Sequence, residues 1–252
     1  MAELTDVAEY LDTALKIDQV EDYPGAWNGL QVECRSPIDR VCVATDACME
    51  TIERAAAAGA NLLFVHHGLF WGDPLPITGR TYRRIRALID ADIALYSCHL
   101  PLDIHPLFGN NSILARSLDL HIEGRFGTWK GIDGMGVWSV VDRPLIDFVA
   151  RVERVCQTTA TVLRGGPPHV RRVAVVTGGG ASFIEQAHAD GFDTLLTGEG
   201  SHHTYHESME YGINVIYAGH YATETFGVKA IGEALNDRFG LEWSFIDHPT
   251  GM

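Results

Sequence analysis

Imidazole and carboxylate side chains recur at matching places in two stretches of this 252-residue chain. The first stretch offers His66-His67-Gly68 and, further on, His99 with Asp103. The second offers His220 with Glu224, so that both copies read His-x-x-x-carboxylate. Nitrogen and oxygen donors without thiolate suit a catalytic Zn, Mn, Fe or Co centre better than a structural zinc site. The pattern therefore predicts a metal-dependent site.

Five of these side chains are predicted to be metal ligands: His66, His67, Asp103, His220 and Glu224. One open catalytic ion needs fewer protein ligands, whereas two ions about 3.5–4 Å apart, bridged by Glu224, would use all five. Two divalent ions with two carboxylates leave a net positive centre, which would activate water and attract an anionic group. We therefore expect two divalent metal ions (Zn, Mn, Fe or Co) per protomer and a small anionic substrate.

Two further histidines are predicted to take part in the chemistry. His99 occupies the place that His220 has in the other copy, as a ligand or as a support for one. His202, with His203 beside it, follows the strand that corresponds to the one before His66-His67. There it would move protons or bind substrate, but a place on a helix surface is an equally good interpretation.

Two turns next to the expected strands also invite interpretation. Asp46 follows the first strand of the first copy, where it is a helix N-cap or an active-site residue. The glycine-rich turn 177–182 holds the corresponding place in the second copy. It lacks the lysine and the spacing of a P-loop, so a plain tight turn is favoured over a phosphate cradle.

The elements that must position these residues belong to an internal repeat. At a constant offset in residue number, Val41 corresponds to Val173, Gly59 to Gly191 and Leu63 to Leu195. Strands alternating with helices predict βαβ units and parallel sheets. We expect an α/β fold of two similar α/β domains from an internal duplication, with mainly parallel sheets and a metal cleft between them. The predicted domains are residues 1–125 and 126–252, the last helix packing back on the first domain.

Apolar runs, caps and turn residues give the expected element bounds. A first helix over 6–17 is expected to be capped by Thr5. In the first copy the strands are 40–45, 61–65 and 93–97, and the helices are 50–58, 80–91 and 112–118. In the second copy the strands are 172–177, 194–197 and 214–217, and the helices are 182–189 and 223–239. Residues 137–141 and 161–163 add strands between the copies.

These bounds place the candidate ligands at the carboxyl ends of strands, where parallel α/β sheets bind ligands. Consecutive strand residues point to opposite faces, so His66 and His67 converge only if the strand has ended and Gly68 turns the chain. Pro101 keeps the residue before it out of the α region and predicts a loop for His99 and Asp103. His220 and Glu224 are expected near the opening of a helix, with both side chains on one face.

Composition excludes several other classes of protein. A net charge of −14 opposes binding to nucleic acid, because phosphates would be repelled. No apolar run approaches the ~20 residues that a membrane helix needs, and the N-terminal residues lack the pattern of a signal peptide. The five cysteines are scattered without a C-x-x-C pair, as reduced thiols would be. We expect a cytoplasmic protein without membrane contact.

The chain resembles the dinuclear-metal-centre proteins of the NIF-three-like family, which are described as type 2 GTP cyclohydrolase I homologues. The resemblance spans nearly the whole chain, and its motifs are specific in combination. They are Trp27-Asn28-Gly29-Leu30-Gln31-Val32, Ala44-Thr45-Asp46, Val65-His66-His67-Gly68, His99-Leu100-Pro101-Leu102-Asp103, Gly109-Asn110-Asn111, Thr197-Gly198-Glu199 with His202-His203, and Ala218-Gly219-His220-Tyr221-Ala222-Thr223-Glu224.

The resemblance implies a two-domain α/β protomer, a hexameric toroid and a two-metal site. By that resemblance His66 and Asp103 hold one metal, His67 and His220 the other, and Glu224 bridges both. Two departures are visible. The family often has an acidic residue between the Trp and Asn of the first motif, absent here, and the chain lacks the inserted domain of longer members.

The predicted function is a two-metal hydrolase acting on a nucleotide or related anionic small molecule. The resemblance favours ring opening of GTP, while phosphoester hydrolysis is equally compatible with the residues. The alternative is a noncatalytic dinuclear metal-binding scaffold or interaction protein. Exchangeable water at the metals separates the two classes, since a catalytic centre keeps open positions and a structural one is closed.

Overall fold

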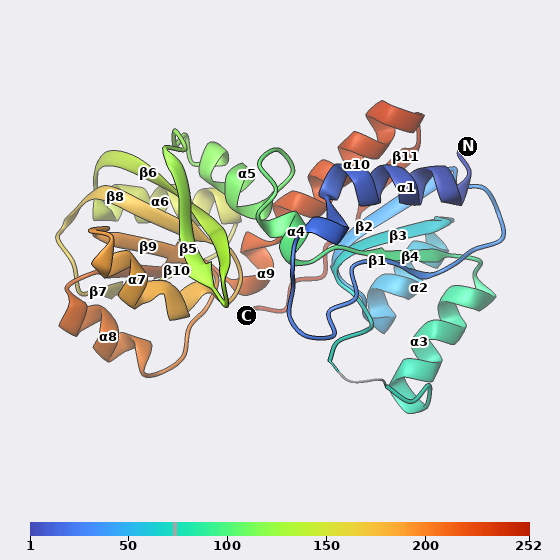
Figure 1. Ribbon diagram of the computed structural model, residues 1–252, viewed down its shortest axis with the longest axis horizontal. Coiled ribbons are helices and arrows are strands. Elements are labelled where there is room, and N and C mark those ends of the chain that lie inside the picture. The colour runs from blue at the N-terminus through green and yellow to red at the C-terminus, as the bar shows by residue number, and fades with distance from the viewer. Residues whose placement is uncertain (73–74) are drawn as a thin grey trace. The chain divides into compact units, whose positions relative to one another are not determined.

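The computed structural model describes residues 1–72 and 75–252 (Figure 1). The chain divides into two compact units. The first unit comprises Met1–Leu102 and Gly227–His248, and the second comprises Asp103–Phe226 and Pro249–Met252. The sequence-based division at residue 125 marks the repeat, whereas this grouping by packing begins the second unit at Asp103.

The first unit is built on a five-stranded sheet of order β1-β4-β3-β2-β11. Its strands are β1 (Gly29–Val32), β2 (Arg40–Asp46), β3 (Leu62–His67), β4 (Ala94–Ser97) and β11 (Glu242–Phe245). β2 pairs in parallel with β3 and β11, and β3 pairs in parallel with β4, while β1 is antiparallel at one edge. The central strands are buried almost throughout, which accounts for their continuous apolar character.

The helical segments of the first unit are α1 (Leu4–Leu15), the 3-10 helix η1 (Ile17–Gln19), α2 (Met49–Ala57), α3 (Gly79–Asp90) and most of α10 (Thr225–Phe239). Of these, α2 and α3 pack apolar side chains against this sheet. Ile52 and Ala55 of α2 and Leu88 of α3 join one buried cluster with Leu63 and Val65 of β3. α2 ends before Gly59, whose positive φ of 70° suits the left-handed turn that leads into β3.

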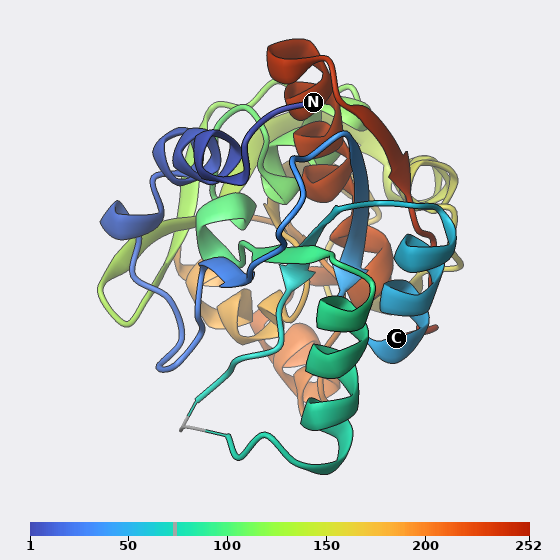
Figure 2. The same cartoon turned by 90° about the vertical axis from the view of Figure 1, so that its right-hand side faces the viewer.

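The end of the chain returns to the first unit. β11 adds a strand beside β2, with Trp243 opposite Val41 and Phe245 opposite Val43. Figure 2 shows this red strand next to the blue β2. A Cβ on Gly232 of α10 would collide with the Trp243 ring, so glycine allows the helix to approach the strand closely. Most of α10, the helix that the sequence predicts to pack back on the first domain, is grouped with the first unit together with β11.

The second unit holds a six-stranded mixed sheet of order β5-β6-β8-β9-β10-β7. Its strands are β5 (Gly124–Trp129), β6 (Ile132–Pro144), β7 (Thr161–Arg164), β8 (His169–Val176), β9 (Thr194–Thr197) and β10 (Asn214–Tyr217). β8, β9 and β10 run parallel, whereas the hairpin β5–β6 and the strand β7 pair antiparallel. This sheet is therefore more mixed than the mainly parallel one that the repeat predicts.

Helices of the second unit fill the connections between these strands. They are α4 (Leu100–Asp103, which straddles the two units), α5 (Asn110–Ser117), α6 (Leu145–Cys156), the 3-10 helix η2 (Gly180–Phe183), α7 (Ile184–Ala189), α8 (Thr204–Tyr211) and α9 (His220–Thr223). Phe148 and Val152 of α6 are buried with Leu114 of α5 against Val173 and Val175 of β8. No helix in the described part of the chain is both long and apolar enough to span a bilayer.

The two repeated stretches form the same β-α-β-α-β arrangement with the same strand register. In the first unit Val41 pairs with Leu62, and in the second the equivalent Val173 pairs with Thr194. Leu62 then pairs with Ala94, and Thr194 pairs with Asn214. Equal register along three parallel strands confirms the prediction of two α/β units related by an internal repeat.

Some sequence-based bounds are wrong for identifiable reasons. α1 begins at Leu4 with Glu3 at its N-cap, and Thr5 lies inside the helix without capping it. The helix expected over 223–239 is two helices, α9 and α10, because the chain leaves helical geometry at Glu224. β1, β5 and β11 were not predicted, since each is a short edge or hairpin strand with little apolar periodicity.

Candidate metal-binding site

Three histidines of the first unit form a compact group at the carboxyl ends of two adjacent strands. His66 and His67 are the last residues of β3, and His99 follows β4. One ligand nitrogen from each lies within 4.8 Å of the others. Ring centroids are 4.5 Å apart for His66 and His67 and 5.0 Å apart for His66 and His99. Three imidazoles at this spacing could bind a metal ion.

Each of these rings directs its Nδ1 atom at an oxygen that can only accept. His66 Nδ1 lies 2.9 Å from the Cys98 carbonyl oxygen. His67 Nδ1 lies 2.9 Å from Asp46 Oδ1, and His99 Nδ1 lies 2.8 Å from Asp22 Oδ1. In the neutral form of each ring, an acceptor at this position requires the proton on Nδ1 and leaves the lone pair on Nε2. Such hydrogen bonds to carbonyl and carboxylate groups are typical of histidines that ligate metals through the other nitrogen.

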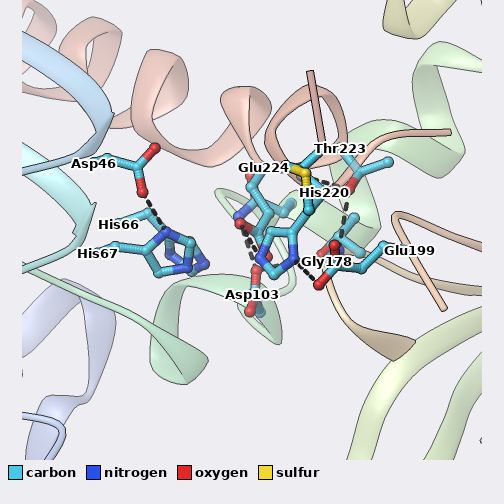
Figure 3. A network of polar contacts seen from close by, with 12 residues as sticks. Asp46, His66, His67, Asp103, Gly178, Glu199, His220, Thr223 and Glu224 are labelled. Carbon is cyan, nitrogen blue, oxygen red and sulfur yellow. Dashed lines mark hydrogen bonds and ion pairs between the residues drawn. The ribbon is translucent and has the colours of Figure 1, made fainter. Parts of the chain in front are cut away.

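Asp46 belongs to the site and does not cap α2. Its carboxylate contacts His67 (Figure 3), and the paired strands place the two residues opposite each other. The N-cap of α2 is Cys48, whose backbone N–H donates to Thr51 Oγ1 at 3.0 Å. Of the two interpretations that the sequence leaves open, the contact with a candidate ligand is the one that the geometry supports.

The convergence of His66 and His67 has a different basis from the predicted one. β3 runs through both residues, so the strand has not ended, yet their rings approach closely. Gly68 is not among the residues with positive φ. Position 68 requires glycine because a Cβ there would collide with the side-chain amide of Gln31 and with Ser97 Oγ. Gly68 thus makes room for Gln31 instead of providing a left-handed turn.

His99 is held by a carboxylate that sequence reasoning missed. Asp22 Oδ2 accepts from Asn28 Nδ2 at 2.8 Å and from the Leu100 backbone N–H at 3.0 Å, while Oδ1 faces His99. The pKa of Asp22 is lowered: burial acts to raise it, and the hydrogen bonds and charge of His99, with Asn28, more than compensate. Asp22 and His99 are 77 residues apart, and no local pattern links them.

Asp103 lies in a short helix and not in the loop that Pro101 predicted. α4 spans Leu100–Asp103 with the proline in its first turn, where a missing N–H costs nothing because it has no partner in the helix. Asp103 Oδ1 accepts from Asn110 Nδ2 at 2.8 Å and from Thr177 Oγ1 at 3.3 Å. These bonds fix a buried carboxylate within the second unit.

A histidine and two glutamates form the other group of the second unit. His220, the first residue of α9, places Nε2 3.1 Å from Glu224 Oε2 and Nδ1 3.0 Å from Glu199 Oε1 (Figure 3). Burial lowers the pKa of His220, but Glu224 and Glu199 outweigh it and raise this pKa to about 9. Glu224 lies just past α9, so the two side chains meet across a helix end and not along one helix face.

The glycine-rich turn after β8 supports these carboxylates and does not cradle a phosphate. Gly178 has φ 66°, and a Cβ there would collide with Glu224 Oε1. Its N–H donates to Thr223 Oγ1 at 3.0 Å, while the N–H of Thr177 donates to Asn111 Oδ1 at 2.8 Å. Gly180 N–H donates to Thr197 Oγ1 at 2.9 Å. These amides already have partners, which favours the plain tight turn.

The match between His99 and His220 is displaced by one residue in the structure. Ser97 pairs with Val65 and Tyr217 pairs with the equivalent Thr197, so Ser97 and Tyr217 hold equal places. Counting onward, His99 corresponds to Gly219 and His220 to Leu100, the first residue of α4. His67 likewise corresponds to Glu199 and Asp46 to Gly178. The repeat therefore supplies equivalent positions, but different residue types carry the chemistry in each copy.

His202 lies apart from these contacts. Its exposed side chain is in the turn before α8, with its ring centroid 6.1 Å from that of His206. His203 is exposed as well, and its Nε2 is 3.9 Å from Glu207 Oε1. A catalytic role for His202 stays a prediction.

Two α/β units with a repeated topology, carrying groups of histidine and carboxylate that could bind metal, define the class of this protein. The family model Duf34/NIF3 (NGG1p interacting factor 3) matches residues 2–251. A protein of Deinococcus radiodurans named GTP cyclohydrolase 1 type 2 homolog is 47% identical over 227 residues, which cover 89% of this chain and 86% of that one. A Halobacterium salinarum protein of the same name is 42% identical over 256 residues, covering 99% of this chain and 100% of the other.

Among solved structures, the protein TTHA1606 from Thermus thermophilus superposes with a TM-score of 0.91 at 40% identity. The match covers 99% of this chain and 100% of that one. The chain therefore belongs to the Duf34/NIF3 family, which confirms the resemblance seen in its motifs.

Proposed function

We propose that the protein binds two divalent metal ions through His66, His67, Asp103, His220 and Glu224. The observation that carries the proposal is the common orientation of the three first-unit imidazoles. Their Nδ1 protons point at Cys98, Asp46 and Asp22, so the Nε2 lone pairs are oriented for a metal. Family membership supports a metal-associated role.

The donor set of the second unit also fits a divalent ion. Ligands at right angles around one ion with bonds of about 2.1 Å are roughly 3 Å apart. His220 Nε2 and Glu224 Oε2 are separated by 3.1 Å. Asp103 and Glu224 are buried carboxylates, which are costly in a protein unless a cation or hydrogen bonds compensate their charge. Nitrogen and carboxylate donors of this kind suit Zn, Mn, Fe or Co.

We propose further that the site hydrolyses a nucleotide or a related anionic small molecule. When bound, the metal ions would supply an activated water and positive charge for the substrate anion. The residues of the chain orient the ligands: Asp46 fixes His67, and Glu199 holds the Nδ1 side of His220. His99, whose Nδ1 faces Asp22, would exchange a proton through Nε2 or serve as a further ligand.

The test is metal analysis coupled to a hydrolysis screen. Chelator-treated protein is reloaded separately with Zn, Mn, Fe or Co, and the ions per protomer are counted by mass spectrometry. GTP, other nucleotides and simple phosphoesters are then incubated with each form, and formate and phosphate are measured. We expect two ions per protomer and metal-dependent turnover of an anionic substrate.

Different failures of this test have different meanings. A protein that contains no metal after mild purification and binds none on reloading would contradict the proposed metal site. Two tightly bound ions without turnover of any substrate would favour the noncatalytic scaffold. His99→Gln separates its two roles: fewer ions per protomer indicate a ligand, whereas unchanged metal content with slower turnover indicates a proton-exchanging group.

A further inference from the structure

A pocket of about 550 Å³ lies in the first unit next to the histidine group. Its walls include five large apolar side chains and one amide: Trp27, Leu30, Phe70, Trp71, Leu75 and Gln31. The Trp71 ring centroid is 4.9 Å from that of His99 and 5.9 Å from that of His67. The volume lies within the ~300–1,000 Å³ of small-molecule sites. The pocket is therefore of ligand size, and its wall residue Trp71 packs against two of the histidines.

Backbone contacts between two chain segments hold the walls in place. Gly25 has φ 77°, and a Cβ there would collide with the backbone of Gly72, so the segments approach as only glycine allows. The Trp27 N–H donates to the Phe70 carbonyl oxygen at 3.3 Å. Such contacts fix the spacing of Trp27 and Trp71, the two indoles of the pocket.

Gln31 joins the same two segments. Its Nε2 donates to the Trp27 carbonyl oxygen at 2.7 Å, and its Oε1 accepts from the Leu69 N–H at 2.8 Å. The Trp71 indole N–H donates to the Gly68 carbonyl oxygen at 3.0 Å. The Gln31 amide and the Trp71 indole N–H thus bind the protein's own backbone. What the pocket offers a ligand is mainly the faces and edges of aromatic rings.

Trp27 is 64% exposed. An indole gains little stability for the fold when it is left this open, but an exposed aromatic face is what a stacking platform for a planar ring needs. Trp71 packs edge-on against His99 with an interplanar angle of 83°. A ring stacked in the pocket would therefore lie close to the imidazoles.

We infer that this pocket binds the planar aromatic ring of the substrate. The pocket recognises the face of that ring by stacking and makes few hydrogen bonds to the edge of the ring. The inference rests on the proposed function, in which the metal centre takes the anionic part of the same molecule. Because the amide of Gln31 and the indole N–H of Trp71 already have backbone partners, hydrogen bonds to the ring edge contribute little. Guanine and adenine rings should therefore bind with similar affinity.

Calorimetric binding of three probes tests this: guanosine monophosphate, adenosine monophosphate and ribose 5-phosphate, which lacks the aromatic ring. Each is titrated into metal-free and metal-loaded protein. Loss of one stacking contact corresponds to roughly a fivefold to hundredfold weaker affinity. Trp27→Ala should weaken both nucleotides by a similar factor in that range and leave ribose 5-phosphate and metal content unchanged.

Two further variants serve as controls. Trp27→Phe keeps an aromatic face and should restore most of the nucleotide affinity, which excludes misfolding of the Trp27→Ala protein. Trp129→Ala removes a tryptophan of β5 in the other unit and should leave all three affinities unchanged.

Several results would overturn the inference. They are equal affinity of wild type for ribose 5-phosphate and the nucleotides, unchanged nucleotide affinity in Trp27→Ala, a more than tenfold preference for one base, or an effect of Trp27→Ala on self-association alone.

Failure of the proposed function would give different results. Trp27-dependent nucleotide binding without any hydrolysis would remove the hydrolase and keep the ring pocket. Metal-dependent hydrolysis of a nucleotide with a KM that Trp27→Ala leaves unchanged would keep the hydrolase and remove the ring pocket.

Discussion

At the scale of single residues, the proposed ligands could be predicted because their types and spacing already carry chemistry. A paired histidine and a repeated His-x-x-x-carboxylate are visible in the sequence without any fold. Their partners are less visible: Asp22 contacts His99 from 77 residues away, and Glu199 faces His220 from the end of another strand. Such partners follow from tertiary packing, which local sequence does not encode.

Replacing Glu224 by Gln tests the proposed bridge. The change keeps the size and hydrogen bonding of the side chain but removes the charge that would compensate two dications about 4 Å apart. We expect most of the metal to be lost, whereas Asp103→Asn should lose mainly one ion. Mass spectrometry of reloaded protein gives the count, with exposed Glu210→Gln as the control. Two ions per protomer in the Glu224→Gln protein would refute the bridging role.

The raised pKa of His220 predicts a pH dependence for the metal-free protein. The folded pKa of about 9 lies above the usual 6.5, so the stabilisation is fully present below pH 6.5 and is lost as pH rises through 9. Metal-free protein should therefore unfold at lower urea concentration at pH 9.5 than at pH 6.5, and Glu224→Gln should reduce this difference. An NMR titration of the His220 ring giving an ordinary pKa would contradict the prediction.

At the scale of elements, the parallel strands of the repeat were predictable and their connections less so. β9 and β10 have the predicted bounds, because buried apolar runs between turn residues mark such strands. The edge strands β1 and β11 lack such continuous apolar runs, because their side chains are only partly buried, and they were therefore not predicted. α4 also escaped, because a proline in the first turn of a helix looks the same in sequence as one in a loop.

Two glycines with the same backbone conformation offer a matched pair of substitutions. Gly178 and Gly59 have φ of 66° and 70°, so alanine should cost each a similar backbone strain of roughly 1 kcal/mol. Only at Gly178 would the new Cβ collide with Glu224, whereas nothing lies within 4 Å at Gly59. Gly178→Ala should therefore lose metal as well as stability, and Gly59→Ala only stability. Urea unfolding and metal content measure both effects; equal metal content in the two variants would contradict this role of the turn.

At the scale of the whole molecule, the sequence predicted two α/β units and a last helix that packs back on the first, but not the strand β11 that returns with this helix. Residues 227–248 belong with Met1–Leu102, because β11 hydrogen-bonds to β2 and α10 covers it. A repeat in sequence shows equivalence, not packing. The predicted division at residue 125 therefore follows the repeat. Which segments pack together is decided by contacts between residues far apart in the sequence.

Assembly is the last property that belongs to this scale. From the family resemblance we predict a homo-oligomer, with six protomers as the expected number. A net charge of −14 per chain opposes association, and salt screens that repulsion as the Debye length falls from about 30 Å at 0.01 M to about 8 Å at 0.15 M. Association at micromolar protein should therefore strengthen as salt is raised over this range. Sedimentation velocity at several salt concentrations measures it, and a monomer at every protein concentration in physiological salt would count decisively against the prediction.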